Sequence, residues 1–279
     1  MDLIQSIFMG FVQGLSEFLP ISSSAHLVFA SGLYKFFTGN VVNVETGEEI
    51  FFNMMLHIGT LFAIFVFFKK EILDIIKALW IAIKTKSLEN KDAKLGLYII
   101  LATFFTVLVA YPLKDFAEYL VYSPAIVGVL LIFTGIYLLL SEFVSKKIEK
   151  KPVTLKSSII MGIAQGLAAF PGFSRSGLTI ATGLFAGLNR VDCARFSFLL
   201  SIPIILGTSI LYPVLELNMK DVVNYNWLSI AVGTIVSAIV GYYCIKYFLA
   251  FLAKFSLGFF AYYCIIAGAF FAVFFKFFA

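Results

Sequence analysis

The sequence predicts an all-α integral membrane protein with six transmembrane helices and two re-entrant helical hairpins, arranged as an inverted-topology repeat. The first observation behind this prediction is composition. Of the 279 residues, 61% are hydrophobic and 13% are charged, and the mean hydropathy is +0.98, whereas soluble domains are about 25% charged. A chain in lipid must satisfy its backbone polar groups internally, which favours helices. The second observation is a duplicated motif, and the third is an uneven distribution of lysine.

A stretch near the N-terminus recurs in the second half of the chain. Residues 9–26 read MGFVQGLSEFLPISSSAH, and residues 161–179 read MGIAQGLAAFPGFSRSGLT. Both begin Met-Gly, continue with Gln-Gly-Leu and break at a proline that precedes Ser-x-Ser. The apolar run before each break has about 14 residues, which is too short to span a bilayer. We therefore expect two helical hairpins, at 3–34 and 157–187, whose broken backbone lines a cavity or packs inside the protein.

Six other apolar runs have the length of about 20 residues that a spanning helix needs. Three follow each hairpin, so the chain divides into two repeats, 1–145 and 146–279, within one membrane domain. The predicted spans are 51–68, 93–111, 122–141, 193–213, 226–246 and 256–275.

Lysine and arginine predict the orientation. Apart from Arg175, most basic residues lie in alternate connections, at 69–94 and 146–156, or flank the later spans. The opposite connections carry only Lys35, Lys114, Lys220 and Lys276. By the positive-inside rule the lysine-rich side is cytoplasmic. The first hairpin then enters from outside and the second from the cytoplasm, with both termini outside. The net charge of +5 follows from this distribution and does not indicate a nucleic-acid partner.

Three smaller features complete the predicted organisation. Over 70–92, apolar residues alternate with Lys and Glu, which predicts an amphipathic helix on the cytoplasmic surface or, alternatively, a plain linker. The N-terminus has no basic region before its first apolar run, so we expect no cleaved signal peptide. Cys193, Cys244 and Cys264 lie far apart in apolar runs without metal-site spacing, and we expect them to be small core residues.

The two breaks are the predicted functional site, because inverted repeats with broken helices place their sites where the breaks meet. Serines after each break are expected to cap new helices: Ser22 and Ser24 in one copy, Ser174 and Ser176 in the other. Free N–H groups and positive dipole ends then point at the break and favour a phosphate. Arg175 adds a guanidinium fork that matches phosphate oxygens.

Glu17, Ser23 and His26 join Arg175 as the catalytic candidates. A carboxylate at membrane depth costs about 3 kcal/mol and usually has a function. The alternative for Glu17 is a salt bridge to Arg175 that only holds the hairpins together. His26 lies three residues after Ser23 on the same helix face, which gives a nucleophile, a base and an orienting carboxylate. A histidine by itself would be interpreted as a buried imidazole that bonds a carbonyl.

Two further polar residues lie close to this set. Gln13 is one turn before Glu17 and can hold a phosphate or a metal-bound water. His57, early in the first span, can reach the site from the outer side or act as a buried polar anchor, and the sequence favours the anchor.

Both motifs resemble the signatures of the undecaprenyl-diphosphatase (bacitracin-resistance) family: QxxxEFLPISSSAH at 13–26 and PGFSRSGLT at 171–179. The length and the segment pattern are similar throughout the chain. The resemblance implies hydrolysis of undecaprenyl diphosphate to the monophosphate and inorganic phosphate, which recycles the lipid carrier of cell-wall (peptidoglycan) synthesis. It implies a site on the periplasmic face of the bacterial inner membrane and adds Thr179 to the substrate-binding residues. It also implies a divalent cation, Mg²⁺ or Ca²⁺, at Glu17 with Gln13, although the family pattern allows Glu or Gln at the first position and this chain has Gln13.

The predicted mechanism places the diphosphate between the two breaks. Arg175 and the backbone N–H groups hold its charge, Ser23 or a water beside it attacks the terminal phosphorus, and Glu17 or His26 takes the proton. The prenyl chain would lie in an apolar groove between spans. The sequence leaves open the nucleophile, the identity of the metal, the selectivity for chain length, lipid flipping and a homodimer.

The alternative is a transporter or flippase of a phosphorylated or anionic lipid, because secondary carriers also use inverted hairpins with midplane anion sites. A non-catalytic scaffold would leave the intramembrane charges unexplained.

Overall fold

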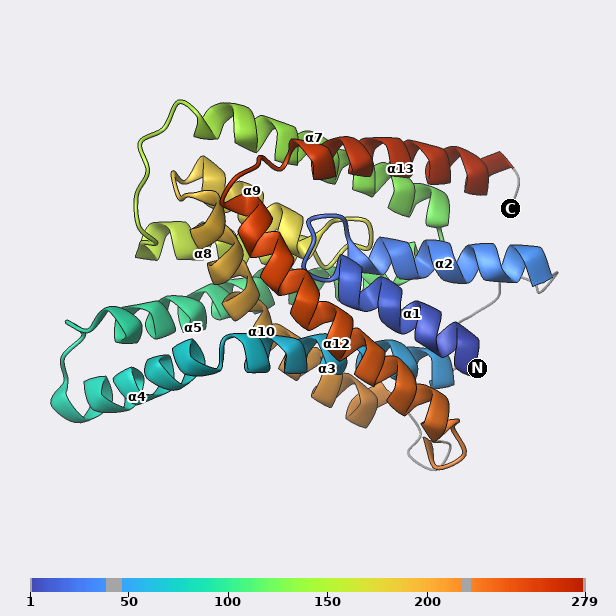
Figure 1. The fold of residues 1–279 in the computed structure, drawn as a ribbon, viewed down its shortest axis with the longest axis horizontal. Helices are drawn as coiled ribbons and strands as arrows, with labels where there is room; N and C mark the ends of the chain where they lie inside the picture. Colours follow the sequence, from blue (N-terminus) through green and yellow to red (C-terminus); the bar gives the residue numbers. More distant parts are fainter. Residues whose placement is uncertain (1, 39–46, 217–221, 278–279) are drawn as a thin grey trace.

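The computed structural model describes residues 2–38, 47–216 and 222–277. Throughout these residues the fold is all-helical and has no strand (Figure 1). Six of the described helices are long and apolar enough to cross a membrane. They are α3 (Gly47–Phe67), α5 (Lys91–Ala110), α7 (Pro124–Ser145), α10 (Arg190–Glu216), α12 (Trp227–Leu252) and α13 (Gly258–Phe277). The all-helical class and the six apolar spanning helices predicted from the sequence are confirmed, with α12 continuing past its expected end at residue 246.

Each half of the chain begins with two short helices joined by a loop. The first pair is α1 (Leu3–Ser16) and α2 (Ser23–Thr38), and the second is α8 (Leu155–Leu167) and α9 (Arg175–Phe185). At about 1.5 Å per residue, none of the four reaches across the roughly 30 Å of bilayer hydrocarbon. The hairpins open toward opposite ends of the bundle, and their loops face each other near its middle (Figure 1). Insertion of the hairpins into a membrane stays a prediction.

The two halves repeat one pattern of helix packing. In the first hairpin α1 packs on α12, and in the second α8 packs on α5, while α7 and α13 pack on each other. Glycines of the duplicated motif lie at these crossings, where an added Cβ would collide with a backbone carbonyl of the partner helix. The pairs are Gly10 with Gly233, Gly14 with Ser237, Gly162 with Ala102 and Gly166 with Thr106. The division into repeats at 1–145 and 146–279 stays a prediction.

The connections between the spans add two elements. The segment expected as an amphipathic helix forms α4 (Lys69–Thr85), which packs along α5 and buries Ile75, Ala78 and Ala82. After α5, a 3₁₀ turn (Tyr111–Leu113) and the short helix α6 (Lys114–Val121) precede α7. Helix α6 was not predicted from the sequence. Pro112, in the 3₁₀ turn, explains why α5 ends where it does, because a proline ring disfavours helix before it.

The ends of the bundle differ in charge. The lysine-rich connection between α4 and α5 and the one between α7 and α8 lie at the same end (Figure 1). The second hairpin returns to that end, where the Lys151 N–H donates to the Gly187 carbonyl over 2.9 Å. The first turn of α1 and the last turn of α13 lie at the other end (Figure 1). The free cysteines Cys193, Cys244 and Cys264 are buried in the core, as expected.

Candidate active site between the two loops

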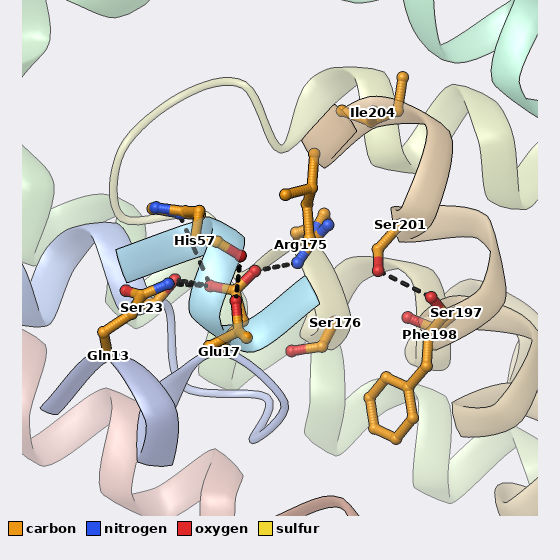
Figure 2. Close-up of polar contacts among 12 residues, drawn as sticks. Gln13, Glu17, Ser23, His57, Arg175, Ser176, Ser197, Phe198, Ser201 and Ile204 are labelled. Carbon is orange, nitrogen blue, oxygen red and sulfur yellow. Dashed lines mark hydrogen bonds and ion pairs between the residues drawn. The ribbon is translucent and has the colours of Figure 1, made fainter. Parts of the chain in front are cut away.

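Glu17 is the centre of the polar contacts between the two hairpins (Figure 2). It follows the last residue of α1, and its side chain is only 3% exposed. Its Oε1 pairs with Nη2 of Arg175, the first residue of α9. Its Oε2 accepts hydrogen bonds from Gln13 Nε2 at 2.9 Å and from Ser23 Oγ at 2.6 Å. One carboxylate therefore connects α1, α2 and α9.

Gln13 holds Glu17 from within α1. The two residues are four apart and share a helix face, and the Glu17 N–H still donates to the Gln13 carbonyl over 3.0 Å. Gln13 is fully buried, and its Oε1 has no hydrogen-bond partner among the described residues. A buried amide oxygen without a donor is uncommon and calls for an explanation, such as an ion or a water.

The loop of each hairpin ends on a serine that caps the following helix, as the sequence predicted. Ser22 Oγ accepts from the Ala25 N–H at 3.3 Å, and Ser174 Oγ accepts from the Gly177 N–H at 3.0 Å. Ser22 has a φ of 68°, in the left-handed region that few non-glycine residues adopt and that is enriched at functional sites. The remaining N–H groups at the starts of α2 and α9 are thus near the contact between the loops.

The loops are tied to each other by a reciprocal pair of hydrogen bonds. Ser176 Oγ donates to the Leu19 carbonyl over 2.9 Å, and Ser22 Oγ donates to the Phe173 carbonyl over 3.5 Å. Thr134 of α7 supports the second loop, since its Oγ1 donates to the Gly172 carbonyl and accepts from the Ser174 N–H, both at 3.2 Å. The relative position of Glu17 and Arg175 is therefore fixed by their neighbours as well as by their own ion pair.

His26 lies apart from this set, contrary to the expectation that it pairs with Ser23. Its Nδ1 is 2.7 Å from the Ser22 carbonyl, and its Nε2 is 2.7 Å from the hydroxyl of Tyr263 on α13. Because a carbonyl only accepts, Nδ1 carries the proton and a neutral ring accepts from Tyr263 at Nε2. Neither ring nitrogen of His26 contacts Glu17 or Ser23.

The hydroxyl groups of two other predicted binding residues, Thr179 and Ser24, have partners other than Glu17. Thr179 Oγ1 is 2.6 Å from Ser197 Oγ of α10 and donates to the Arg175 carbonyl over 2.8 Å, so it joins α9 to α10. Ser24 Oγ lies 3.2 Å from Ser22 Oγ. Of the predicted site residues, the structure brings Gln13, Glu17, Ser23 and Arg175 into direct contact, with Ser22, Ser24, Ser174 and Ser176 around them.

His57 of α3, for which the sequence favours the role of a buried polar anchor, lies at Glu17 in the structure. Its Nε2 lies 3.7 Å from Glu17 Oε2, and its Nδ1 is 2.8 Å from the Asn53 carbonyl. It is both anchored within its own helix and directed at the carboxylate (Figure 2). The available signal was its presence in a span that is otherwise almost free of ionisable groups.

This geometry supports phosphoryl chemistry. Ser23 Oγ lies within proton-transfer distance of Glu17. Beside this carboxylate, the Arg175 side chain is 20% exposed and supplies a positive charge. The donor set also fits a divalent cation, since a carboxylate and an unpaired amide oxygen, Gln13 Oε1, are oxygen ligands of the kind that hard cations take.

Fold and site together define a polytopic membrane protein that holds a serine, a carboxylate and an arginine where two broken helices meet. The chain belongs to the family described as bacitracin resistance protein BacA, whose model matches residues 6–270. This confirms the resemblance that the two motifs predicted. The chain is 40% identical to the undecaprenyl-diphosphatase of Methanosphaera stadtmanae over 96% of each chain. It is 40% identical to undecaprenyl-diphosphatase 2 of Halalkalibacterium halodurans over 95% of this chain and 93% of that protein, and 37% identical to the undecaprenyl-diphosphatase of Saccharophagus degradans over 96% and 97%.

Proposed function

We propose that this chain is a membrane phosphatase that hydrolyses undecaprenyl diphosphate to undecaprenyl phosphate and inorganic phosphate. One observation carries the chemistry: Ser23 Oγ donates to Glu17 Oε2 over 2.6 Å while Arg175 pairs with the other oxygen of the same carboxylate. The names of the relatives supply the substrate. The product is the lipid carrier of cell-wall synthesis, so the reaction returns the carrier to use.

The terminal phosphate binds where the two loops meet. Arg175 and the N–H groups at the start of α9 hold its oxygens, and the same groups stabilise the charge that spreads over them during transfer. Because Arg175 already pairs with Glu17, the incoming phosphate shares the guanidinium with that carboxylate. The ion pair thus keeps the arginine in place before the substrate arrives.

Ser23 is the nucleophile in this mechanism. Glu17 takes the Ser23 hydroxyl proton as Oγ forms a bond to the terminal phosphorus, and the bond from phosphorus to the bridging oxygen breaks. Glu17 passes this proton to the leaving oxygen, and undecaprenyl phosphate departs. A water then attacks the phosphoserine and gives its proton to the ionised Glu17, the bond from phosphorus to Oγ breaks to release phosphate, and Glu17 returns the proton to Ser23 Oγ. In the variant with direct water attack, Glu17 accepts the proton of that water and Ser23 positions it.

Glu17 and Gln13 would hold a divalent cation, Mg²⁺ or Ca²⁺. When bound, such an ion would supply positive charge against the charge of the diphosphate. His26 contributes indirectly, since its ring is fixed between the Ser22 carbonyl and Tyr263 and so supports the start of α2.

The prenyl chain lies in an apolar groove on the lipid-facing side of the first hairpin. A groove of about 460 Å³ runs between α1 and α12, and Leu19 from the first loop forms part of its wall. Phe11, Leu15, Tyr243 and Phe260 are also in its lining. Since Ser176 bonds the Leu19 carbonyl, the groove begins next to the residues that surround the phosphate.

The orientation follows from the charged end of the bundle. The lysine-rich end faces the cytoplasm by the positive-inside rule, so the first re-entrant hairpin opens to the periplasm and the second to the cytoplasm. The site then serves the periplasmic face of the bacterial inner membrane, and both termini lie outside. A homodimer stays a prediction.

The test is phosphate release from a prenyl diphosphate by the purified protein in detergent. The wild type is compared with Glu17→Gln, Ser23→Ala, His26→Ala and Arg175→Ala, and with Ser209→Ala, a buried serine of α10, as the matched control. We expect release by the wild type and the control and its loss in the Glu17, Ser23 and Arg175 variants. Accumulation of the lipid or anion in sealed vesicles without phosphate release would instead indicate the transporter.

A further inference from the structure

The contact between His57 and Glu17 lacks a proton donor when the imidazole is neutral. The His57 Nδ1 lies 2.8 Å from the Asn53 carbonyl, which only accepts, so Nδ1 carries the hydrogen. The free electron pair of Nε2 then points toward Glu17 Oε2, 3.7 Å away, which is another acceptor and too distant for a hydrogen bond. A cation between the two would give the nitrogen a partner and would add one to Glu17 Oε2, which already accepts from Gln13 and Ser23.

The tautomer of His57 is the one that metal-ligating histidines have. Such residues almost always donate their second ring N–H to a carbonyl, a carboxylate or a water, which fixes the ring and directs the other nitrogen to the metal. In α3 the Asn53 carbonyl, one turn earlier, has this role. His57 is also partly accessible, with a side chain that is 32% exposed against 3% for Glu17, so an ion can approach from its side.

Gln13 supplies a second group without a partner. Its amide nitrogen donates to Glu17 Oε2, whereas its buried Oε1 has no hydrogen-bond partner among the described residues. The equivalent Gln165 of the second repeat also has an unpaired Oε1, but its amide nitrogen bonds Thr106 and the Leu200 carbonyl. The first repeat therefore differs by placing a carboxylate at the glutamine amide and an imidazole at that same carboxylate.

We propose that His57 is a ligand of the divalent cation, together with Glu17 and Gln13, and that this nitrogen makes the site favour Mn²⁺ over Ca²⁺. The proposal rests on the cation assigned under the proposed function. Ca²⁺ takes oxygen ligands, whereas imidazole nitrogen raises the affinity of a site for first-row transition ions, and Mn²⁺ accepts both kinds of ligand. Glu17 supplies one carboxylate and Gln13 supplies a neutral amide oxygen, so His57 adds the third protein ligand.

The experiment measures metal binding by the purified chain in detergent, without substrate. Mn²⁺ is titrated and its free fraction is followed by electron paramagnetic resonance, and Ca²⁺ is tested by competition. We expect His57→Leu to weaken Mn²⁺ binding by about tenfold or more and to change Ca²⁺ binding less than threefold. Met54→Leu, on the same helix, is the control and should bind as the wild type does.

A spectroscopic readout on the wild type does not depend on the folding of any variant. Electron spin echo modulation of Mn²⁺ bound to the wild type should show a coupled imidazole nitrogen. The chain has two histidines, and both nitrogens of His26 are already engaged, so His26→Ala should keep that signal and His57→Leu should remove it.

Three results would overturn the proposal: no Mn²⁺ binding by the wild type, no nitrogen coupling in its bound Mn²⁺, or unchanged Mn²⁺ affinity in His57→Leu. The last result would leave His57 as an ion-pair partner of Glu17 only. If Mn²⁺ binds through His57 but prenyl diphosphate is not hydrolysed, the function is wrong and the metal site stands.

Discussion

Replacing Glu17 by glutamine tests whether this carboxylate is catalytic or only holds the hairpins together. The amide keeps the size of the side chain but removes its charge and its ability to take a proton from Ser23, which donates to it over 2.6 Å. Loss of a positioned general base lowers kcat by about 10²–10⁴-fold. The same change leaves Arg175 without its ion-pair partner. Breaking a buried pair in this way costs about 3–5 kcal/mol, and the 20% exposure of Arg175 places the cost near the lower limit.

The two effects are separated by a second variant. Arg175→Gln combined with Glu17→Gln removes both charges, so the unfolding temperature in detergent should return toward that of the wild type while kcat stays low. Phosphate release and thermal unfolding are measured on the same preparations. Glu17 is not the general base if Glu17→Gln keeps more than a tenth of the wild-type kcat, or if activity recovers together with stability in the double variant.

Four other outcomes are expected. Ser23→Ala should lower kcat by at least about 10²-fold, because it removes the nucleophile and its hydrogen bond to the general base. Rapid acid quenching of the wild type should trap a phosphoserine. If no phosphoserine is found during a full single turnover, water is the nucleophile. Tyr263→Phe removes the hydroxyl at His26 Nε2 and should lower kcat about fivefold, since one hydrogen bond contributes about 1 kcal/mol; an unchanged kcat would mean that the orientation of His26 has no effect on turnover. Ile239→Trp narrows the groove between α1 and α12 and should raise KM for a long prenyl diphosphate more than for a short one. The control is Ile136→Trp, in a separate groove of about 320 Å³ beside α7 and α9, which should not have this effect. Equal effects of the two variants on KM would argue against the assigned groove. Gly162→Leu inserts a side chain where Ala102 of α5 leaves no room for a Cβ, and it should destabilise the protein by about 1–3 kcal/mol or more. The control is Gly207→Leu, since nothing lies within 4 Å of a Cβ added there. This variant should leave the unfolding temperature nearly unchanged.

The architecture was largely predictable because its signals are local in the sequence. Six long apolar runs determine the spans, and the proline and serines after each short run determine where each hairpin turns. The meeting of Glu17 with Arg175 was also predictable, since inverted repeats bring their breaks together. The short helix α6 was missed although its apolar residues lie on one face, because its eight residues are fewer than the roughly 11–18 over which helical periodicity is recognised.

The details of the site depended on partners that are distant in sequence. His26 and Ser23 share a helix face, which suggested a catalytic pair, but Tyr263 on α13 and the Ser22 carbonyl engage the ring instead. Thr179 contacts Ser197 for a similar reason, because α10 covers that face of α9. His57 is at the site because α3 packs beside α1, and the spacing within the sequence contains no information about that contact.

In the proposed mechanism the terminal phosphate binds where the loops meet, between Arg175 and Ser23. The most direct measurement is an experimental structure with a prenyl methylenediphosphonate, whose carbon bridge resists hydrolysis. We expect the terminal phosphonate within hydrogen-bond distance of the Arg175 guanidinium and in line with Ser23 Oγ, with the prenyl chain along α1 and α12. A phosphonate bound elsewhere, such as among the lysines beside α4, with Glu17 and Arg175 still paired and out of its reach, would contradict the account.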